Sequence, residues 1–387
     1  MKKVVVGLSG GVDSSVAAYL LKNEGYEVHG LFMKNWSDQQ GVLTSSCTWE
    51  DDLAFAEIVA KKLDIPLHFV DFSEEYRKRV VDYMFEEYKR GRTPNPDVLC
   101  NREVKFDLFA KEAQKFEADY IATGHYVNKE VSISTGNSVY RLLAGKDPGK
   151  DQSYFLCQLS QKQLKRALFP VGQLHKDEVR RIAKEQNLAT ASRKDSQGIC
   201  FVGKVDLPKF LQQQLVPRKG NIVKIDESEI YIPEGYSDYR RLTQPHNFTR
   251  MNGEKVGEHT GAHFFTVGQR KGLQVGGMKA PLYVIGTDTK RNIVYTGEGE
   301  NHPGLFRKGL FVKRKDVHWL REDLENGFNE QALDIRIRYR QPLQKGKILK
   351  EKEGYYVLFD QPQRAVTPGQ FVAWYKEDEL LGSGVIQ

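Results

Sequence analysis

The stretch Val4-Val5-Val6-Gly7-Leu8-Ser9-Gly10-Gly11-Val12-Asp13-Ser14-Ser15 decides the fold class of this chain. Its apolar first half is typical of a fully buried strand, and the residues that follow begin a helix. Gly10 and Gly11 allow the backbone between strand and helix to turn tightly and to approach a ligand closely. Amides at the start of a helix attract an anion, and the helix dipole adds to that attraction. The stretch therefore predicts a phosphate-binding loop, and the simpler alternative is an ordinary strand-to-helix turn capped by Asp13 or Ser14.

The loop differs from the two commonest phosphate-binding patterns. No Gly-Lys-Ser/Thr follows it, as a Walker A loop would require, and its spacing is not that of a dinucleotide-binding G-x-G-x-x-G. The run 9–15 resembles the PP-loop of the ATP pyrophosphatases, which hold ATP and release pyrophosphate. This resemblance implies that AMP is transferred to an oxygen atom of the substrate. It assigns ATP contacts to loop residues Gly7, Leu8, Ser9, Gly10, Gly11, Val12, Asp13 and Ser14.

Short apolar runs alternate with helical stretches in the first third of the chain. We expect strands at 4–8, 26–33, 67–72 and 120–123, with helices at 14–24 and 48–63. For the second helix we expect a cap at Thr48 with Asp51, and one apolar face made of Phe55, Ile58, Val59, the stem of Lys62 and Leu63. This alternation predicts an α/β domain whose parallel sheet is covered on both faces and binds ligands at the carboxyl ends of its strands.

The pattern changes in the second half of the chain. From about residue 280, apolar and polar residues alternate strictly, as in 335–340, 355–359 and 371–375, which predicts an antiparallel sheet or small barrel. We therefore predict a PP-loop domain over 1–204, a small central domain over 205–278 and a C-terminal antiparallel β-barrel over 279–387.

Composition restricts the class of protein. The 387 residues are 40% apolar with a net charge of +7, which permits nucleic-acid binding. No run approaches the ~20 apolar residues of a membrane span, and the N-terminus lacks the pattern of a signal peptide, so we expect a cytoplasmic protein without membrane contact. The cysteines Cys47, Cys100, Cys157 and Cys200 form no C-x-x-C pair, so no zinc ribbon and no protein metal site are expected.

Six further stretches follow the loop: 31–36, 93–101, 122–126, 150–156, 195–201 and 266–273. Together with the loop and in this order, they resemble the tRNA-specific 2-thiouridylases. The resemblance spans nearly the whole chain and implies ATP-dependent 2-thiolation of the wobble uridine of tRNA. It also implies ATP as a substrate accompanied by Mg²⁺, tRNA as a partner, and a sulfur-donating protein, either a cysteine desulfurase or a sulfur carrier.

Exchanging a carbonyl oxygen for sulfur requires an activated oxygen and a nucleophilic sulfur. Adenylation supplies the first and a cysteine persulfide the second, and a further cysteine releases the sulfur by attacking the S–S bond. The resemblance places the persulfide on Cys200 and makes Cys100 its partner nucleophile. Asp97, three residues before Cys100, is positioned to take a proton or to orient the base. Cys157 is interpreted as a buried core thiol, and no motif assigns a role to Cys47.

The resemblance also assigns binding residues outside the loop. Met33 would pack on the adenine, and Gly124 would allow the nucleotide to lie close to the sheet. The target base would meet Asn95, Pro96 and Asp97. The tRNA contacts would be His125, Lys150, Asp151, Gln152, Arg338, Tyr339 and Gln370.

Two basic segments have alternative interpretations. The alternation over 335–340 would place Arg336, Arg338 and Arg340 on one face of a strand, either as an RNA surface or as a solvated face over a barrel core. The segment 227–250 is interpreted as an insertion rich in tyrosine and arginine, which either contacts RNA or forms a small packing cluster of its own.

Two other functions remain open at this point. A PP-loop ligase that adenylates a small molecule would use the same loop without requiring Cys100 and Cys200. A non-enzymatic RNA-binding protein would have lost ATP binding altogether.

Overall fold

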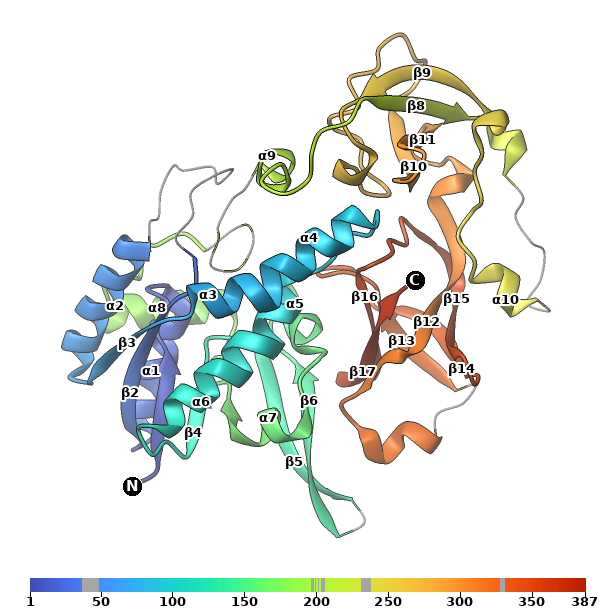
Figure 1. Ribbon diagram of the computed structural model, residues 1–387. Coiled ribbons are helices and arrows are strands. Elements are labelled where there is room, and N and C mark those ends of the chain that lie inside the picture. The colour runs from blue at the N-terminus through green and yellow to red at the C-terminus, as the bar shows by residue number, and fades with distance from the viewer. Residues whose placement is uncertain are drawn as a thin grey trace.

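The computed structural model describes residues 1–387 except 37–48, 135, 196–197, 199, 201, 203–205, 231–237 and 328–330. Figure 1 shows an α/β domain, a small β domain and a β-barrel, which follow one another along the chain. Thr48, the expected helix cap, lies outside the described residues. So does Cys47, to which no motif assigns a role. No described helix combines the length and apolarity needed to cross a membrane.

The first domain is built on a five-stranded parallel sheet. Its strands, in spatial order, are β3 (Leu67–Asp71), β2 (Glu27–Lys34), β1 (Lys3–Gly7), β4 (Tyr120–Ala122) and β7 (Ala167–Leu168). Side chains of β1 alternate between two cores, since Val4 and Val6 enter one and Val5 enters the other. Both faces of the sheet are therefore covered, as the apolar run of β1 predicted.

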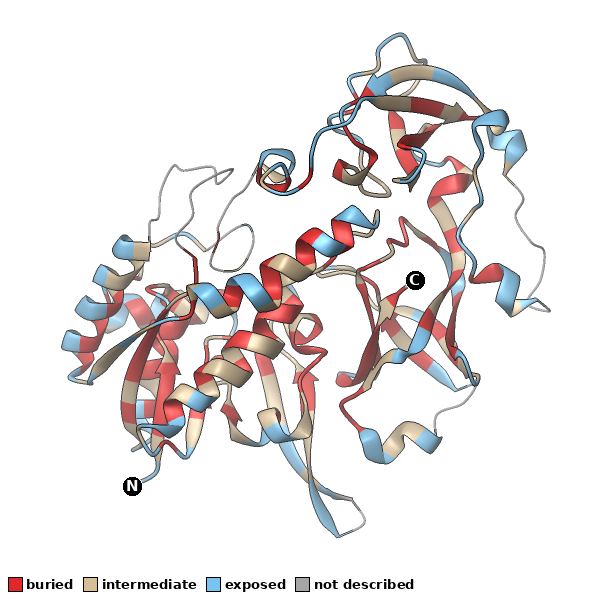
Figure 2. Ribbon diagram, in the orientation of Figure 1, coloured by how far each residue is buried: buried red, intermediate tan, exposed pale blue. Residues whose placement is uncertain are grey.

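Helices α1 (Val12–Asn23), α2 (Trp49–Leu63) and α8 (Lys176–Glu185) cover one face of this sheet. The other face is covered by a longer series of short helical elements. They are α3 (Ser73–Tyr76), η1 (Arg77–Val81), α4 (Asp82–Lys89), α5 (Pro96–Cys100), η2 (Asn101–Leu108) and α6 (Phe109–Gln114). Figure 2 shows buried residues recurring along these helices.

The expected buried face of α2 was partly wrong. Val59 and Leu63 are buried as expected, but Ile58 is 52% exposed, and Ala56 and Ala60 are buried in addition. The helix is rotated so that two alanines face the sheet, and their small side chains allow a close approach. Periodicity alone did not show this, because alanine is a weak apolar signal.

Both η1 and η2 are π-helical, and η2 directly follows α5. A π-helix bonds residue i to i+5, so residues five apart share a face. Residues 100 and 105 therefore lie on the same side of this segment.

The central domain contains a four-stranded sheet. Its order is β10 (Leu282–Asp288), β11 (Ile293–Glu298), β8 (Gly220–Ile225) and β9 (Gly253–His259). The expected boundary after residue 278 is therefore displaced, because β10 and β11 pair within this sheet rather than within the barrel. Helix α9 (Leu207–Leu211) precedes the sheet, and α10 (Tyr239–Leu242) lies in the segment between β8 and β9.

The third sheet has eight strands. They run in the order β12 (Phe306–Trp319), β15 (Gly354–Arg364), β14 (Gln344–Lys350), β13 (Ala332–Arg336), β16 (Phe371–Lys376), β17 (Glu379–Ile386), β6 (Asn137–Ala144) and β5 (Val127–Ser134). Pairing of β12 with β17 closes the barrel. The hairpin β5–β6 belongs to the first domain and joins the barrel sheet through β17, so the two domains share a sheet.

The expected strand over 335–340 is shorter than predicted. β13 ends at Arg336, and Ile335 and Ile337 are buried in the barrel core as expected. Arg336 does not form an RNA surface, because its side chain is only 11% exposed and forms an ion pair with Asp151 at 2.8 Å. Residues 338–341 turn away from the sheet, with the amide of Gln341 bonded to the carbonyl of Arg338.

Candidate active site

The loop between β1 and α1 has the form of an anion cradle. Gly10 takes a positive φ of 70°, and a Cβ there would lie 2.2 Å from the carbonyl oxygen of Asp52. The Ser14 hydroxyl accepts a hydrogen bond from the amide of Ser9 at 3.2 Å and donates to the carbonyl of Gly11 at 3.1 Å. Gly11 caps α1 without a side-chain acceptor, so the first amides of the helix are left for a ligand.

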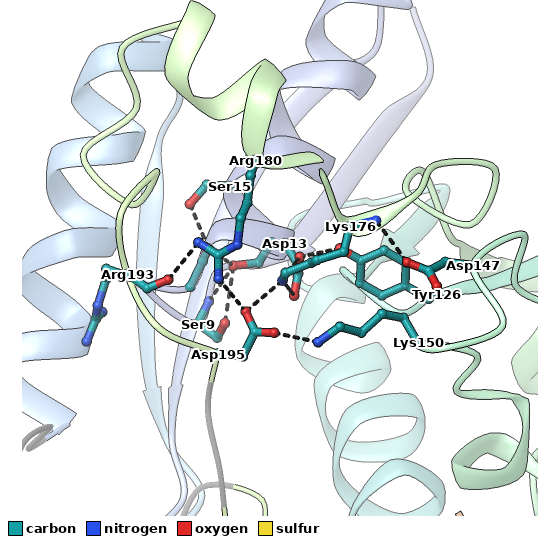
Figure 3. A network of polar contacts seen from close by, with 12 residues as sticks. Ser9, Asp13, Ser15, Tyr126, Asp147, Lys150, Lys176, Arg180, Arg193 and Asp195 are labelled. Carbon is teal, nitrogen blue, oxygen red and sulfur yellow. Dashed lines mark hydrogen bonds and ion pairs between the residues drawn. The ribbon is translucent and has the colours of Figure 1, made fainter. Parts of the chain in front are cut away.

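Cationic side chains from α8 and the neighbouring loops surround this cradle (Figure 3). Lys176 Nζ lies 2.7 Å from Asp13 Oδ1 and 2.8 Å from Asp195 Oδ1. Asp195 also forms ion pairs with Lys150 at 2.6 Å and with Arg180 at 2.8 Å. One buried lysine thus links the phosphate loop to the segment that leads to Cys200.

These cations determine the charge of Asp195. Burial alone would raise its pKa, but hydrogen bonds from Lys150 and Lys176, together with their charges, lower the pKa to about 2. Asp195 is therefore ionised at neutral pH. Lys176 could not be identified as a site residue from the sequence, because it lies 163 positions from Asp13 and no pattern relates the two.

Gly124 and Met33 both lie next to the loop. A Cβ on Gly124 would come within 2.7 Å of the Asp13 carbonyl carbon and 2.8 Å of the Ser14 amide nitrogen. Glycine is therefore required where the end of β4 touches the loop. Met33 is buried, and its methyl group would be 3.5 Å from a Cβ on Gly7.

The segment 93–97 is held by all three domains. The Asn95 side chain caps α5 by accepting from the Val98 amide at 3.3 Å, and Pro96 occupies the first turn, where an amide hydrogen is dispensable. From the barrel, Gln370 Nε2 donates to the carbonyls of Thr93 at 2.9 Å and Pro94 at 3.1 Å. From the central domain, the hydroxyl of Thr266 lies 3.0 Å from that of Thr93.

Cys100 and Cys200 meet at the end of α5. Their side chains are hydrogen-bonded to each other, although the residues are 100 positions apart. Asp97 holds the Cys200 backbone, since its carboxylate accepts from the Cys200 amide at 2.8 Å. The hydroxyl of Tyr76 donates to the Cys200 carbonyl at 2.7 Å. The structure thus brings together the three residues expected to be catalytic.

The pKa values of the two thiols are shifted in opposite directions. Burial, followed by the interaction with Cys200, raises the pKa of Cys100 well above its ordinary value. The hydrogen bond from Cys100 lowers the pKa of Cys200, and the nearby charge of Lys105 adds to this effect against the cost of burial. The pair therefore holds its first negative charge on the sulfur of Cys200. Burial raises the pKa of Asp97, which favours a protonated carboxyl group.

Lys105 also belongs to the site, although no sequence pattern indicated it. Its ammonium group is hydrogen-bonded to Cys200, and the two cysteines raise its pKa although burial acts in the opposite direction. Lys105 follows Cys100 by five residues, the spacing that a π-helix brings to one face. An α-helical reading of the segment gives no reason to connect the two residues.

Several residues expected to contact tRNA lie in the interior. His125 is 7% exposed and bonded to the hydroxyl of Thr123, and burial lowers its pKa well below the ordinary value. Asp151 is 6% exposed and accepts from Ser153 and Arg336. Both side chains are buried in the protein without RNA, so a direct contact of His125 or Asp151 with tRNA stays a prediction. Gln152 accepts a hydrogen bond from the Tyr126 amide at 3.0 Å.

Of the remaining expected tRNA contacts, Arg338, Tyr339 and Gln370 belong to the barrel and Lys150 to the first domain. Arg338 is half-buried and donates to the carbonyl of Arg364 at 3.1 Å. The ring of Tyr339 packs on Phe155 with centroids 4.3 Å apart, and Gln370 holds segment 93–97 as described above. Lys150 is partly exposed beside Asp195.

The insertion packs against the barrel in its described part. Tyr239 donates to Glu351 at 2.7 Å and packs edge-on against Tyr356, and Arg240 lies 3.7 Å from Glu353. The described tyrosine and arginine therefore support the packing interpretation. Tyr231 and Tyr236 lie outside the described residues.

Among the described residues, no group of three His, Cys, Asp or Glu side chains is arranged to hold a metal ion.

The fold and the loop together define a PP-loop protein with two appended β domains. Residues 2–204 match the family model described as tRNA methyl transferase HUP domain. Residues 238–298 match the tRNA methyl transferase PRC-barrel domain, and residues 309–386 match the aminomethyltransferase beta-barrel domain. The last two matches agree with the strand pairing, which assigns β10 and β11 to the central domain.

Curated relatives cover the whole chain. A protein of Flavobacterium johnsoniae named tRNA-specific 2-thiouridylase MnmA is 59% identical over 394 residues, with both chains covered completely. A protein of the same name from Christiangramia forsetii is 56% identical with the same coverage. One from Pseudomonas aeruginosa is 44% identical, covering 100% of this chain and 94% of its own. The chain belongs to the tRNA-specific 2-thiouridylase family.

Proposed function

We propose that this protein catalyses the ATP-dependent 2-thiolation of the wobble uridine of tRNA, with Cys200 as the persulfide carrier and Cys100 as its partner. The observation that carries the proposal is the contact between the two thiols beside Lys105 and Asp97. The names of the full-length relatives support the same reaction and the same RNA substrate.

The first step is activation of the uracil C2 oxygen. The cradle from Gly7 to Ser14 suits the phosphates of MgATP, because its helix amides and hydroxyls offer donors to an anion. Attack of the C2 oxygen on the α-phosphorus forms a C–O–P bond and releases pyrophosphate. In this proposal Met33 and Gly124 complete the nucleotide site, since both adjoin the loop.

The second step is sulfur transfer. The terminal sulfur of a persulfide on Cys200 attacks C2, and the thiolate of Cys100 then attacks the Cys200 sulfur. The bond between the two persulfide sulfurs breaks, a Cys100–Cys200 disulfide forms and AMP leaves with the C2 oxygen. A reductant must return two electrons to the disulfide before the next turnover.

The charges in the site fit this order of events. A thiolate on Cys200 is the form that accepts a sulfur atom from a donor protein, and Lys105 stabilises that charge. Once sulfur is bound, Cys100 must lose its proton, and Asp97 lies close enough to the pair to relay it. Asn95, Pro96 and Asp97 form the proposed base pocket, because they precede Cys100 on the same short helix.

The observed site is less suited to the alternative functions. A small-molecule ligase of this class has no use for two mutually bonded cysteines. An RNA-binding protein without catalysis has no use for an open phosphate cradle.

The test is thiolation of unmodified tRNA with MgATP and a persulfide source, followed by digestion and mass spectrometry of the nucleosides. We expect 2-thiouridine with the wild type, and none with Cys200→Ser or Cys100→Ser. Cys157→Ala is the matched control, because Cys157 is a buried thiol whose pKa burial raises to about 12. ATP consumption without thiouridine would reject the proposal in favour of the ligase.

A further inference from the structure

A segment of the central domain contacts the barrel at one end and the central sheet at the other. Residues 238–248 form this strap, which lies between β8 and β9 and includes α10. Helix α10 packs on β12 and β15 of the barrel (Figure 1). The strap therefore spans two domains, although along the chain it belongs to one of them.

A tyrosine holds the barrel end of the strap. The hydroxyl of Tyr239 donates to the carboxylate of Glu351 at 2.7 Å. Its ring packs edge-on against Tyr356, with centroids 5.1 Å apart. Leu242, the last residue of α10, is buried. A hydrogen bond, an aromatic pair and a buried leucine thus fix this end of the strap.

A buried arginine of the barrel adds to this attachment. Arg307 is 8% exposed, and its guanidinium donates to the carbonyl of Thr243, the residue that follows α10. Burial lowers the pKa of Arg307 to about 10, so the side chain is still charged at neutral pH. Carbonyl groups at the end of a helix attract cations. Burying a charge is unfavourable without a partner, and the end of α10 provides that partner.

The other end of the strap is held by the central domain. The ring of Phe248 lies 5.6 Å from that of Tyr295 on β11, measured between centroids. A Cβ on Gly286 of β10 would come within 3.0 Å of the Phe248 ring, so the glycine leaves room for that ring. Between the two ends, His246 Nε2 lies 3.1 Å from the carbonyl oxygen of Phe306, the first residue of β12.

The strap is a second connection between domains that the chain already joins. The chain passes from β11 of the central domain to β12 of the barrel over residues 299–305. A short connection of this kind can act as a hinge. Phe306, which follows it, pairs with Arg364 at one end of β15, whereas the strap attaches near the other end, at Tyr356. Attachments at two separate points prevent a rotation that one point would allow.

Both of the connected domains contact Thr93, at the start of the segment that contains the proposed base pocket. From the central domain, the hydroxyl of Thr266 lies 3.0 Å from that of Thr93. From the barrel, the carbonyl of Pro368 accepts from the Thr93 amide at 2.8 Å, and Gln370 donates to the Thr93 carbonyl at 2.9 Å. Thr93 can make all three contacts only while the two domains keep a fixed relative position.

We propose that the strap positions the target-base segment by locking the central domain against the barrel. Its two ends act in series, so that releasing either end releases the lock. The inference deepens the function proposed above and rests on it. Tyr239 and Phe248 are positioning residues in this account, because they act on the base segment through Thr266 and the barrel rather than by touching the substrate.

The experiment compares Tyr239→Ala, Phe248→Ala and the double variant with the wild type. We expect each single variant to lower kcat/KM for tRNA about two- to tenfold, the worth of one hydrogen bond at the base segment. Hydrogen–deuterium exchange of the peptide that contains the Thr93 amide should be faster by a similar factor, roughly two- to tenfold. The double variant should be no worse than the single variants, because the lock is already released. Independent packing losses would instead multiply.

Met251→Ala is the matched control, because Met251 lies just beyond the strap and is 96% exposed. Affinity for ATP should be equal in all variants, since the phosphate cradle lies in the first domain. Exchange at Thr93 equal to that of the wild type, or losses that multiply in the double variant, would overturn the inference. If a variant does not fold, Tyr239→Phe and Phe248→Leu replace the alanine variants, with the same outcomes deciding. A wild type that forms no thiouridine would reject the proposed function, while the exchange measurement would still decide on the strap.

Discussion

The two thiols differ because of the residues that touch them. Cys100 is fully buried, while Cys200 is partly exposed and hydrogen-bonded to both Cys100 and Lys105. The motif contexts of the two cysteines were sufficient to predict the pair from the sequence. Lys105 could not be predicted, because its contact depends on a π-helical turn that leaves no clear sequence signal.

Replacing Lys105 with methionine should raise the pKa of Cys200, because a positive charge that stabilises the thiolate is lost. Iodoacetamide alkylates thiolates, and its reaction with Cys200 can be followed by mass spectrometry. Near neutral pH this reaction should be about fivefold or more slower in Lys105→Met than in the wild type. The estimate follows from a charge at contact distance being worth at least ~1 kcal/mol. The rate should recover at higher pH, and Lys105→Arg should restore it in part.

The control for this experiment is Lys111→Met, which removes an exposed lysine of α6 paired with Asp107. A pH profile for Lys105→Met that coincides with that of the control would show that Lys105 does not act on the thiol.

Asp195→Asn should destabilise the protein in a pH-dependent way. The folded pKa of Asp195 is about 2, below its ordinary 3.8, so its contribution is present above about pH 4 and is lost as pH falls through about 2. The difference in Tm between the wild type and Asp195→Asn should therefore be constant from pH 5 to 7 and shrink below pH 4. Differential scanning fluorimetry across this range checks it, and a difference that grows on acidification would contradict the assigned pKa.

Among the structural elements, the strand and helix around the phosphate loop were the most predictable, and the barrel strands over 355–359 and 371–375 were also confirmed. One local stretch contains a buried strand, a pair of glycines and the start of a helix. The positions of β1, the loop and α1 were therefore predicted to within about two residues. The strand over 335–340 was overextended because its alternation continues into a turn. The ion pair of Arg336 with Asp151, between residues 185 positions apart, could not be predicted from local pattern.

Gly124→Ala should weaken ATP binding on the order of tenfold. Its Cβ would lie within 2.9 Å of three Asp13 and Ser14 atoms, two of them main-chain, so the loop would be displaced. Gly276→Ala is the control, since a Cβ there meets open space. Isothermal titration calorimetry with ATP makes the comparison. Equal affinities for both variants would show that the contact of β4 with the loop has no bearing on the nucleotide.

For the whole molecule, the barrel and the central domain both help to shape the site in the first domain. Gln370 and Thr266 hold segment 93–97, which contains the proposed base pocket. The Arg336–Asp151 ion pair joins the barrel to the loop after Lys150. The sequence predicted a PP-loop domain, a central domain and a C-terminal barrel, but not that the last two would hold segment 93–97. It did not predict that β6 would pair with β17, because pairing between distant strands is set by tertiary packing.

Arg336→Met should destabilise the barrel by about 3–5 kcal/mol, because it leaves the buried carboxylate of Asp151 unpaired. Lys345→Met is the comparison, since Lys345 pairs with Asp334 at the surface with 70% of its side chain exposed, where ~0–1 kcal/mol is expected. Urea unfolding followed by tryptophan fluorescence makes the comparison, with Trp319 and Trp374 in the barrel core and Trp36 and Trp49 in the first domain. If Arg336→Met lowers the free energy of unfolding no more than Lys345→Met does, the Arg336–Asp151 pair does not stabilise the barrel.

The central claim is that Cys100 and Cys200 act as a pair that transfers one sulfur atom and becomes a disulfide. The most direct measurement is a single turnover of persulfide-loaded enzyme with tRNA and MgATP, without reductant, followed by peptide and nucleoside mass spectrometry. The account predicts one 2-thiouridine per enzyme and a Cys100–Cys200 disulfide in equal amount. Thiouridine formed in full while both cysteines remain free thiols would contradict it.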